Sequence, residues 1–386
     1  STEPDRRPGS KGNHEAVEYV AGRLAESGCT VGYQEFPCLD WDTQGGALTV
    51  GDTTVDLTPS PYGSGIKASG PIRVARKIGD LARNDLVGSL LILTGDLASE
   101  PLTPKAFPFY GSDEHESIIA ALEAAAPAAV IAVTGKYPEL CGALDPFPLI
   151  EDGDFNIPTA NVTPERGELL LKEEGRTATV EIASTRKPSQ ARNVIGVLGS
   201  QSERITVIAH IDTKPGTPGA VDNGTGVVAL LALARLLARH ARLPIGVELL
   251  AVNGEDHYAA PGELAWLKKH GDALDDIPLV INIDGAGYRS GRSAYSTYNI
   301  DGDLAGHVER VFESRDDFMR GPEWFQSDHA IFAMRGRPAL AITTEHVQEM
   351  LGELFHSAAD TPDQVDIDLV VGIALALEEL VATWPE

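Results

Sequence analysis

Six ionisable side chains in the second half of the chain have the types and positions expected of metal ligands or of an acid–base group beside them. All are His, Asp or Glu at the end of an apolar run or in a loop: His210, Asp222, Glu255, Asp256, Asp284 and His356. Two imidazoles with several carboxylates form a mixed nitrogen and oxygen set, which suits Zn²⁺, Mn²⁺ or Co²⁺. The set suits two ions rather than one, since a carboxylate such as Asp222 can bridge ions ~3.5–4 Å apart.

Two of these positions follow apolar runs that have the composition of buried strands. The run Arg204–Ala209 leads to His210 and Asp212, and the run Leu279–Ile283 leads to Asp284. Because side chains alternate along a strand, His210 and Asp212 point the same way. We expect these side chains at the carboxyl end of a sheet, where open α/β sheets bind their ligands.

The remaining candidates lie at the end of a third run or in loops. Gly246–Val252 is strand-like and leads to Glu255 and Asp256. Asp222 precedes a helical pattern, and His356 lies in a later loop. A single buried His is usually a core residue, and a strand-end Asp usually caps the next helix. Several such residues in one sheet, in chain order, favour a shared site over these separate explanations.

The part of the chain after Pro188 alternates strand-like runs with helical patterns. The strand-like runs are Arg192–Leu198, Arg204–Ala209, Gly246–Val252 and Leu279–Ile283. The helical patterns are Thr225–Arg239, Pro261–His270, Leu304–Ser314 and Ile367–Thr383. This alternation predicts an α/β fold, with a mixed twisted sheet that is covered by helices on both faces.

The middle of the chain differs, because short apolar runs alternate there with Gly, Pro, Asp and Thr. From Leu39 to Pro188 this pattern predicts a mostly β module with one helix, Glu116–Ala125. An N-terminal helical pattern at Gly12–Gly28 and a strand-like stretch at Thr30–Phe36 precede it. We therefore expect a discontinuous α/β domain at residues 1–39 and 188–386, interrupted by an inserted domain at residues 40–187.

Length, composition and charge narrow the class of protein. The chain has 386 residues, of which 42% are apolar and 23% charged, and these values are typical of a globular protein of more than one domain. The net charge of −26 argues against nucleic acid and acidic membranes as partners, because both are themselves negatively charged. No apolar run reaches the ~18–20 residues of a membrane span, so membrane insertion is not expected.

Cysteine usage and the start of the chain leave the compartment open. Cys29, Cys38 and Cys141 are too few for a disulfide framework, and a bond between Cys29 and Cys38 is possible but not required. No cleavable secretory segment is present, but the chain begins at Ser1 without Met, so a leader could have been removed. The sequence fits a soluble protein that is either cytoplasmic or secreted after loss of a leader.

In their chain order, these motifs resemble the M28 family of co-catalytic zinc aminopeptidases. The motifs are His210-x-Asp212, Asp222-Asn-Gly, Glu255-Asp256, Asn282-x-Asp284 and His356-Ser-x-x-Asp360-Thr. The resemblance covers the N-terminal helix, including Arg7-Pro-Gly-Ser10, and the chain from Arg192 to its end. The middle resembles a protease-associated domain, and Asn156-Ile-Pro-Thr-Ala-Asn161 is similar to a late strand of that domain.

The resemblance implies a ligand set for two divalent ions, zinc in the first place, with manganese or cobalt as alternatives. His210 and Asp284 would hold one ion. Asp256 and His356 would hold the other, and Asp222 would bridge both. The family often has Glu where this chain has Asp256, whose shorter side chain implies a deeper ion or a different binding mode.

The resemblance also implies the reaction, which is hydrolysis of the N-terminal residue from a peptide substrate. Asp212 would support His210 and fix its tautomer. Glu255 would act as the general base, taking a proton from a water between the ions and returning it to the leaving amine. Many members have a Tyr that donates to the oxyanion, but the two corresponding positions here hold Phe355 and Trp324.

Other functions on the same scaffold remain open at this level. They are a carboxypeptidase or deacylase that uses two metal ions, a glutaminyl-cyclase-like transferase that uses one zinc, and a non-catalytic binding homologue. Both half-sites are complete in the sequence, which disfavours the last two. The oligomeric state and the preferred N-terminal residue are not fixed by the sequence.

The segment Ser327-Asp328-His329 contains the three residue types of a serine-protease triad. Consecutive side chains diverge, so these three cannot form the relay that such a triad needs. Two other interpretations remain for the segment: it shapes the substrate pocket, or its hydrogen bonds hold a loop beside the site.

Overall fold

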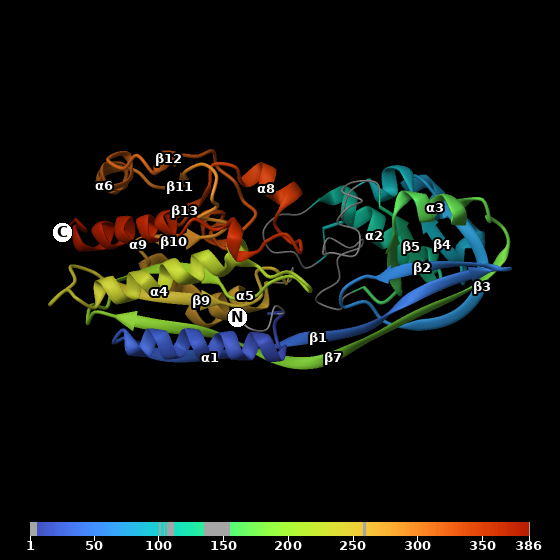
Figure 1. Cartoon of the computed structure of the whole chain (residues 1–386), viewed down its shortest axis with the longest axis horizontal. Helices are drawn as coiled ribbons and strands as arrows, with labels where there is room; N and C mark the ends of the chain where they lie inside the picture. The colour runs from blue at the N-terminus through green and yellow to red at the C-terminus, as the bar shows by residue number, and fades with distance from the viewer. Residues whose placement is uncertain are drawn as a thin grey trace. The chain divides into compact units, whose positions relative to one another are not determined.

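The chain folds into two compact units, as the computed structural model in Figure 1 shows for residues 6–99, 102–103, 105, 112–134, 155–257 and 260–385. One unit comprises Ser1–Pro37 and Gln190–Glu386, and the other comprises Cys38–Ser189. Both boundaries fall inside long strands, β1 (Thr30–Val50) and β7 (Thr177–Leu198). Cys29 and Cys38 are free thiols, and Cys141 lies outside the described residues.

The first unit contains every strand and helix that was predicted after Pro188. Its helices are α1 (Lys11–Glu26), α4 (Thr225–Leu237), α5 (Pro261–His270), α6 (Gly302–Glu313), α7 (His329–Ala333), α8 (Val347–Glu353) and α9 (Ile367–Ala382). Its strands, besides parts of β1 and β7, are β8 (Arg204–His210), β9 (Gly246–Val252), β10 (Val280–Ile283), β11 (Ser293–Tyr298), β12 (Phe318–Arg320) and β13 (Ala339–Thr344). Helix α1 is capped by Ser10, whose side chain accepts a hydrogen bond from the N–H of Asn13.

The sheet of this unit is mixed, with the strand order β7-β9-β8-β10-β13-β11-β12. Strands β9, β8, β10 and β13 are parallel to one another. Strand β7 runs antiparallel to β9, and β11 runs antiparallel to β13. The expected α/β fold with a mixed sheet is therefore confirmed, and the parallel strands lie at its centre.

Helices cover both faces of this sheet, as the alternation of side chains along β10 demonstrates. Ile281 and Ile283 belong to the apolar core that α1, α4 and α9 share with the sheet. Asn282 lies between them and points to the opposite face, where its amide donates to Ser327 Oγ at 2.8 Å. His329, at the start of α7, lies on that same face, with Nδ1 3.2 Å from the Asn282 amide.

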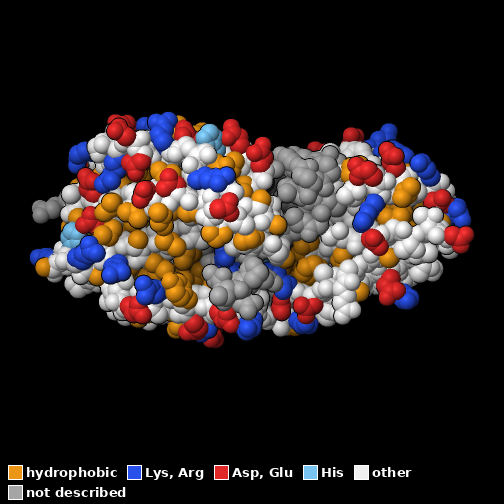
Figure 2. Space-filling model, in the orientation of Figure 1, with side chains coloured by type: hydrophobic (Ala, Val, Ile, Leu, Met, Phe, Trp, Pro, Cys, Tyr) orange, Lys and Arg blue, Asp and Glu red, His pale blue; other side chains and the backbone are white. Residues whose placement is uncertain are grey.

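An apolar surface extends over α4 and α9, where Figure 2 shows hydrophobic side chains gathered on one face. Among the large apolar side chains of these two helices, Val228 on α4 and Val371 and Leu375 on α9 are 41–46% exposed. Within the part of the chain that the structure describes, one segment, Ala220–Leu237, is long and apolar enough to cross a membrane. More than half of that segment is buried inside the unit, and a core helix has the same composition.

The second unit has its own sheet and its own apolar cores. Its strands, besides parts of β1 and β7, are β2 (Thr53–Pro59), β3 (Ile66–Ala75), β4 (Leu90–Leu93), β5 (Ala129–Val133) and β6 (Thr159–Val162). Their order is β1-β2-β6-β5-β4-β3-β7, and β1 also pairs with β7, so the strand order closes on itself. Thr43 of β1 donates through its hydroxyl to the carbonyl of Ala183 in β7.

This unit differs from expectation in its helices. Helix α2 (Asp113–Ala125) includes the predicted one, but a second helix, α3 (Pro164–Leu171), was not predicted. Pro164 at its first turn and Glu165 beside it are ordinary start signals. The helix has only eight residues, of which Gly167 and Leu170 are buried, so its apolar stripe is too short to reveal a helical period.

Candidate metal centre

The carboxyl ends of the central parallel strands bring the predicted residues to one edge of the sheet. Asn282 of β10 pairs with Ile208 of β8, so Asp284 comes level with His210, two residues further along each strand. His210 itself pairs with Val252, the last residue of β9. The loop that carries Glu255 and Asp256 therefore begins beside His210, as expected for ligand positions in a parallel sheet.

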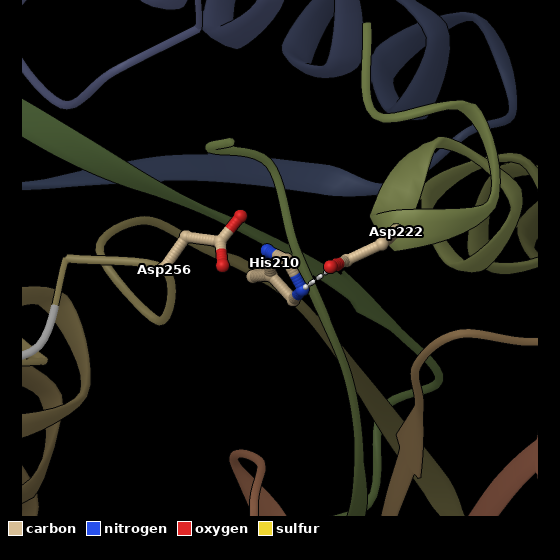
Figure 3. A group of neighbouring side chains, drawn as sticks. All are labelled: His210, Asp222 and Asp256. Carbon is tan, nitrogen blue, oxygen red and sulfur yellow. Dashed lines mark ion pairs between the residues drawn. The ribbon is translucent and has the colours of Figure 1, made fainter. Parts of the chain in front are cut away.

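Asp222 lies between the two predicted imidazoles. Its Oδ1 is 3.2 Å from Nε2 of His210, and its Oδ2 is 3.3 Å from Nε2 of His356. The side chain projects from the turn before α4, where the backbone of Asp222 and Asn223 is non-helical. Figure 3 shows the carboxylates of Asp222 and Asp256 turned toward the ring of His210 from opposite sides.

Each imidazole also has a second carboxylate neighbour of its own. Nε2 of His210 is 3.3 Å from Oδ1 of Asp284, and Nε2 of His356 is 3.0 Å from Oδ1 of Asp256. The structure thus brings together all five residues that were expected to hold metal ions. They form two imidazole–carboxylate pairs that have Asp222 in common.

Glu255 lies on the side of the cluster that contains His210 and Asp284. Its Oε2 is 3.8 Å from Nε2 of His210, and the ligand atoms of Glu255, His210 and Asp284 all lie within 4.8 Å of one another. Its neighbour Asp256 has Oδ1 3.0 Å from Nε2 of His356, so the two consecutive side chains contact different imidazoles at closest approach. Burial raises the pKa of Glu255 well above its usual range, and the nearby carboxylates raise it further.

Asp212 is buried beside His210, but its carboxylate is not the nearest acceptor for that ring. Nδ1 of His210 is 3.2 Å from the main-chain carbonyl oxygen of Asp212 and 3.8 Å from its carboxylate. The carboxylate instead accepts a 2.6 Å hydrogen bond from the N–H of Gly254, in the loop before Glu255. A main-chain carbonyl can fix the tautomer of an imidazole as a carboxylate does, so the carboxylate is left to hold the Glu255 loop.

Ser327 orients the carboxylate of Asp284. Its hydroxyl donates to Oδ2 of Asp284 at 2.5 Å, while Oδ1 of that carboxylate faces His210. The amide of Asn282 donates to Ser327 Oγ and so fixes the hydroxyl in turn. The two ring nitrogens of His329 have other neighbours than the Ser327 hydroxyl: Nδ1 lies 3.2 Å from the Asn282 amide nitrogen, and Nε2 lies 2.7 Å from the carbonyl oxygen of Trp324. The divergence predicted for the Ser327–His329 segment is present.

Asp360 supports the backbone that carries Asp222. Its carboxylate accepts hydrogen bonds from the N–H groups of Val221 at 2.7 Å and Asp222 at 3.0 Å. Its carbonyl oxygen accepts a third, from the N–H of Ala220. Burial, with the charge of Asp222, raises the pKa of Asp360 to about 7. The loop after His356 is thereby joined to the turn that projects the shared carboxylate.

Arg6 is a buried residue of the site region that the sequence analysis did not identify. Its guanidinium donates to three carbonyl oxygens, those of Ile211 at 2.9 Å, Pro218 at 2.8 Å and Gly219 at 2.9 Å. These carbonyls lie in the loop between His210 and Asp222. All its acceptors are main-chain atoms more than 200 positions away, so residue types alone give no signal for it.

The two positions at which the resemblance implies a Tyr hold Phe355 and Trp324, and both side chains are buried. A Cβ built on Gly285 would lie 2.7 Å from Cζ of Phe355, so that ring packs directly against the glycine. The hydroxyl of Tyr298 is engaged by the main-chain N–H and carbonyl of Trp324. The indole Nε1 of Trp324 is buried, and no described residue accepts a hydrogen bond from it.

The chemistry of this cluster fits a cation. The ligand atoms of His210, Asp222 and Asp256 lie within 4.8 Å of one another. Although burial lowers the pKa of His210, the carboxylates of Asp284 and Asp222 raise it well above its usual value. Buried carboxylates in such number are stable only when they are paired or coordinate a cation. The cluster is therefore a metal-binding candidate on its own geometry.

Comparison with known proteins identifies the family of this unit. Residues 193–381 match the profile described as Peptidase family M28. A probable lipoprotein aminopeptidase of Mycobacterium tuberculosis is 28% identical over 312 residues, which are 78% of this chain and 58% of that relative. The chain thus spans less than two thirds of the length of this relative.

Solved structures share the fold along nearly the whole chain. An aminopeptidase from Aneurinibacillus sp. strain AM-1 has a TM-score of 0.77 at 19% identity and covers 98% of this chain and 89% of its own. A zinc aminopeptidase from Bacillus subtilis has a TM-score of 0.73 at 18% identity, with 98% and 90% covered. Residues 193–381, which include every predicted site residue, thus form a domain of peptidase family M28.

Proposed function

We propose that this protein is a metal-dependent aminopeptidase that removes the N-terminal residue of peptides. The observation that carries the proposal is the position of Asp222, which presents one carboxylate oxygen to His210 and the other to His356. A carboxylate placed between two imidazoles can serve two ions ~3.5–4 Å apart, the spacing found in two-metal hydrolases. Family membership and the relative from Mycobacterium tuberculosis, itself called a probable aminopeptidase, support this reaction.

The ligand assignment follows the two pairs in the cluster. His210 and Asp284 would hold one ion, Asp256 and His356 would hold the second, and Asp222 would serve both. Two imidazoles with three carboxylates suit Zn²⁺, and Mn²⁺ or Co²⁺ are the alternatives. The solved relative from Bacillus subtilis is described as a zinc aminopeptidase, which favours zinc here.

Glu255 is the group that moves protons. When bound, the divalent ions would lower the pKa of a water and polarise the scissile carbonyl. The carboxylate of Glu255 would accept the proton of that water and later deliver it to the nitrogen of the leaving amine, so it would end the cycle ionised. Its position beside His210 and Asp284, with Asp256 closest to His356, supports this division of roles. Asp212 holds the Glu255 loop through the N–H of Gly254.

Replacement of the base tests this function most directly. Glu255→Gln keeps the size of the side chain but cannot accept the proton, so kcat should fall about 10²- to 10⁴-fold while both ions remain bound. Glu203→Gln, an exposed position away from the cluster, is the matched control. Metal content and turnover are measured on the same preparations. Turnover near the wild-type rate in a metal-replete Glu255→Gln protein would show that Glu255 is not the base.

Substrate analogues separate this function from its rivals. Aminoacyl substrates with a free α-amine should be cleaved, and their N-acetylated forms should not. Cleavage that survives acetylation points to a deacylase or carboxypeptidase on the same scaffold. A metal content near one ion per chain, with ring closure of N-terminal glutamine, points to a glutaminyl-cyclase-like transferase. Absence of turnover in fully metal-loaded protein points to a binding homologue.

The second unit, predicted as an insert at residues 40–187, is proposed to be a protease-associated domain that limits which peptides reach the cluster. The segment from Asn156 to Asn161, which prompted this assignment, contains the start of β6. Wild-type protein is compared with a variant that lacks residues 40–187, using di-, tri- and hexapeptides. An unchanged preference for peptide length in a variant that still binds metal would contradict the gating role.

A further inference from the structure

A pair of buried carboxyl groups lies outside the ligand set. Glu263 is 2% exposed and Asp328 is fully buried. No N–H or O–H of the described residues donates to any of their four carboxyl oxygens. The carboxyl group of Asp328 lies within hydrogen-bonding distance of that of Glu263. The two acids therefore have each other as their polar partners.

Two carboxylates in contact inside a protein cannot both be ionised, because their charges repel and neither is solvated. One of them must keep a proton, which it donates to the other. Burial and the neighbouring carboxyl of Glu263 raise the pKa of Asp328 well above its usual range. A hydrogen bond from a neutral acid to a carboxylate is short and strong, since one partner is charged.

The two acids belong to segments that carry different parts of the metal cluster. Glu263 lies in the first turn of α5, which begins a few residues after Glu255 and Asp256. Asp328 directly follows Ser327, whose hydroxyl donates to Asp284 at 2.5 Å. A contact between Glu263 and Asp328 therefore joins the loop of the base to the segment that orients a ligand.

The start of α5 is held on its other side as well. The carbonyl oxygen of Gly262 accepts a 2.8 Å hydrogen bond from the amide of Asn193. The oxygen of the same Asn193 amide accepts the N–H of Asn253, at the end of β9. Asn193 thus ties α5 to the sheet, but it does not reach the Ser327 segment. The only direct polar contact from α5 to that segment among the described residues is the one between Glu263 and Asp328.

We propose that a proton shared between Glu263 and Asp328 fixes the position of Glu255 relative to Asp284. Both acids are positioning residues, since neither is among the residues that face the imidazoles. The inference rests on the proposed function in taking Glu255 as the base. It predicts that the hydrogen bond, rather than the charge, is what the site requires at these positions.

Amide substitutions test that distinction in the full-length, metal-loaded protein. Glu263→Gln can donate its N–H to the carboxylate of Asp328, so kcat should stay within about threefold of the wild type. Glu263→Ala removes the contact, and the displaced base should lower kcat about tenfold or more while KM and metal content stay the same. Asp328→Asn and Asp328→Ala should behave in the same two ways.

A double variant and a control complete the experiment. Because both alanines break one contact, Glu263→Ala with Asp328→Ala should be no slower than the slower single variant. Glu248→Gln is the matched control, since Glu248 is another buried acid that contacts α5 through Trp266 but not Asp328. Its kcat should match that of the wild type.

Several results would overturn the proposal. They are Gln and Asn variants as slow as the alanine variants, alanine variants with normal kcat, or losses that multiply in the double variant. If an alanine variant does not fold, the amide variants still test the proposal. It requires that they unfold at the wild-type temperature and have near-normal kcat, and failure of either would contradict it. Metal binding and unfolding are measured without turnover. Failure of the aminopeptidase proposal is therefore recognised separately, because the wild-type protein would then bind metal and hydrolyse no peptide.

Discussion

The hydroxyl of Ser327 donates a 2.5 Å hydrogen bond to Oδ2 of Asp284. The other oxygen of the same carboxylate lies 3.3 Å from His210 Nε2. One hydroxyl thereby determines which carboxylate oxygen faces the cluster. Supporting hydrogen bonds of this kind orient metal ligands and raise their affinity for the ion.

Ser327→Ala should therefore weaken metal binding about 10- to 100-fold without unfolding the protein. The carboxylate of Asp284 would keep its charge but lose the donor that holds its orientation. Calorimetric titration of zinc into metal-free protein gives the affinity. Ser314→Ala removes a hydroxyl that only bonds within the end of α6 and should leave the affinity unchanged. Equal affinities in the two variants would mean that Ser327 does not orient the ligand.

Asp222→Asn should reduce the number of bound ions below two per chain. An amide offers one oxygen and one nitrogen that carries hydrogens, so only one of the two imidazole–carboxylate pairs keeps its third ligand. Elemental analysis of the purified protein measures the stoichiometry. Asp303→Asn, at an exposed position of α6, serves as the control. A variant that still binds two ions would show that Asp222 is not shared.

Removal of metal should lower the unfolding temperature, and added zinc should restore it. Ions that bind only the folded state stabilise it by about 2.7 kcal/mol at a free concentration of 100 times the dissociation constant. Differential scanning calorimetry with and without a chelator measures the change. The shift should be smaller in Asp222→Asn. An unfolding temperature that a chelator leaves unaltered would contradict a metal site in the folded protein.

Arg6→Lys should destabilise the protein by about 1–3 kcal/mol, because two of the three buried carbonyl oxygens would lose their donor. The ammonium group of Lys cannot reproduce the forked geometry of the guanidinium. Urea denaturation gives the free energy of unfolding. Arg23→Lys changes an exposed arginine of α1 that pairs with Glu26 and should have little effect. A similar, small loss in both variants would mean that the Arg6 fork is dispensable.

The residues that hold the chemistry could be predicted because their positions follow from strand geometry. His210 and Asp284 end parallel strands, and the alternation of side chains along a strand specifies where each one points. Their residue types also state the chemistry, since imidazole and carboxylate groups have few roles in common other than metal binding or proton transfer. Periodicity and residue type together were therefore enough to predict the strands of the sheet and the residues of the cluster.

The supporting residues could not be predicted, because their partners have no signature in the sequence. Arg6 bonds to main-chain carbonyls, which every residue possesses. Glu263 and Asp328 resemble surface acids until the fold removes both from water. The Asp212 carboxylate was expected to hold His210, but the nearest acceptor for that ring is the carbonyl of the same residue. Such contacts depend on tertiary distances that one-dimensional patterns do not contain.

Strands β1 and β7 are neighbours in the sheet and carry the only two crossings between the units. The chain thus leaves the first unit on one strand and returns to it on the neighbouring strand. A domain can be inserted, exchanged or lost between two such neighbouring strands without changing the order of the elements that follow. The second unit can therefore change in size or sequence while the elements that carry the metal cluster keep their order along the chain.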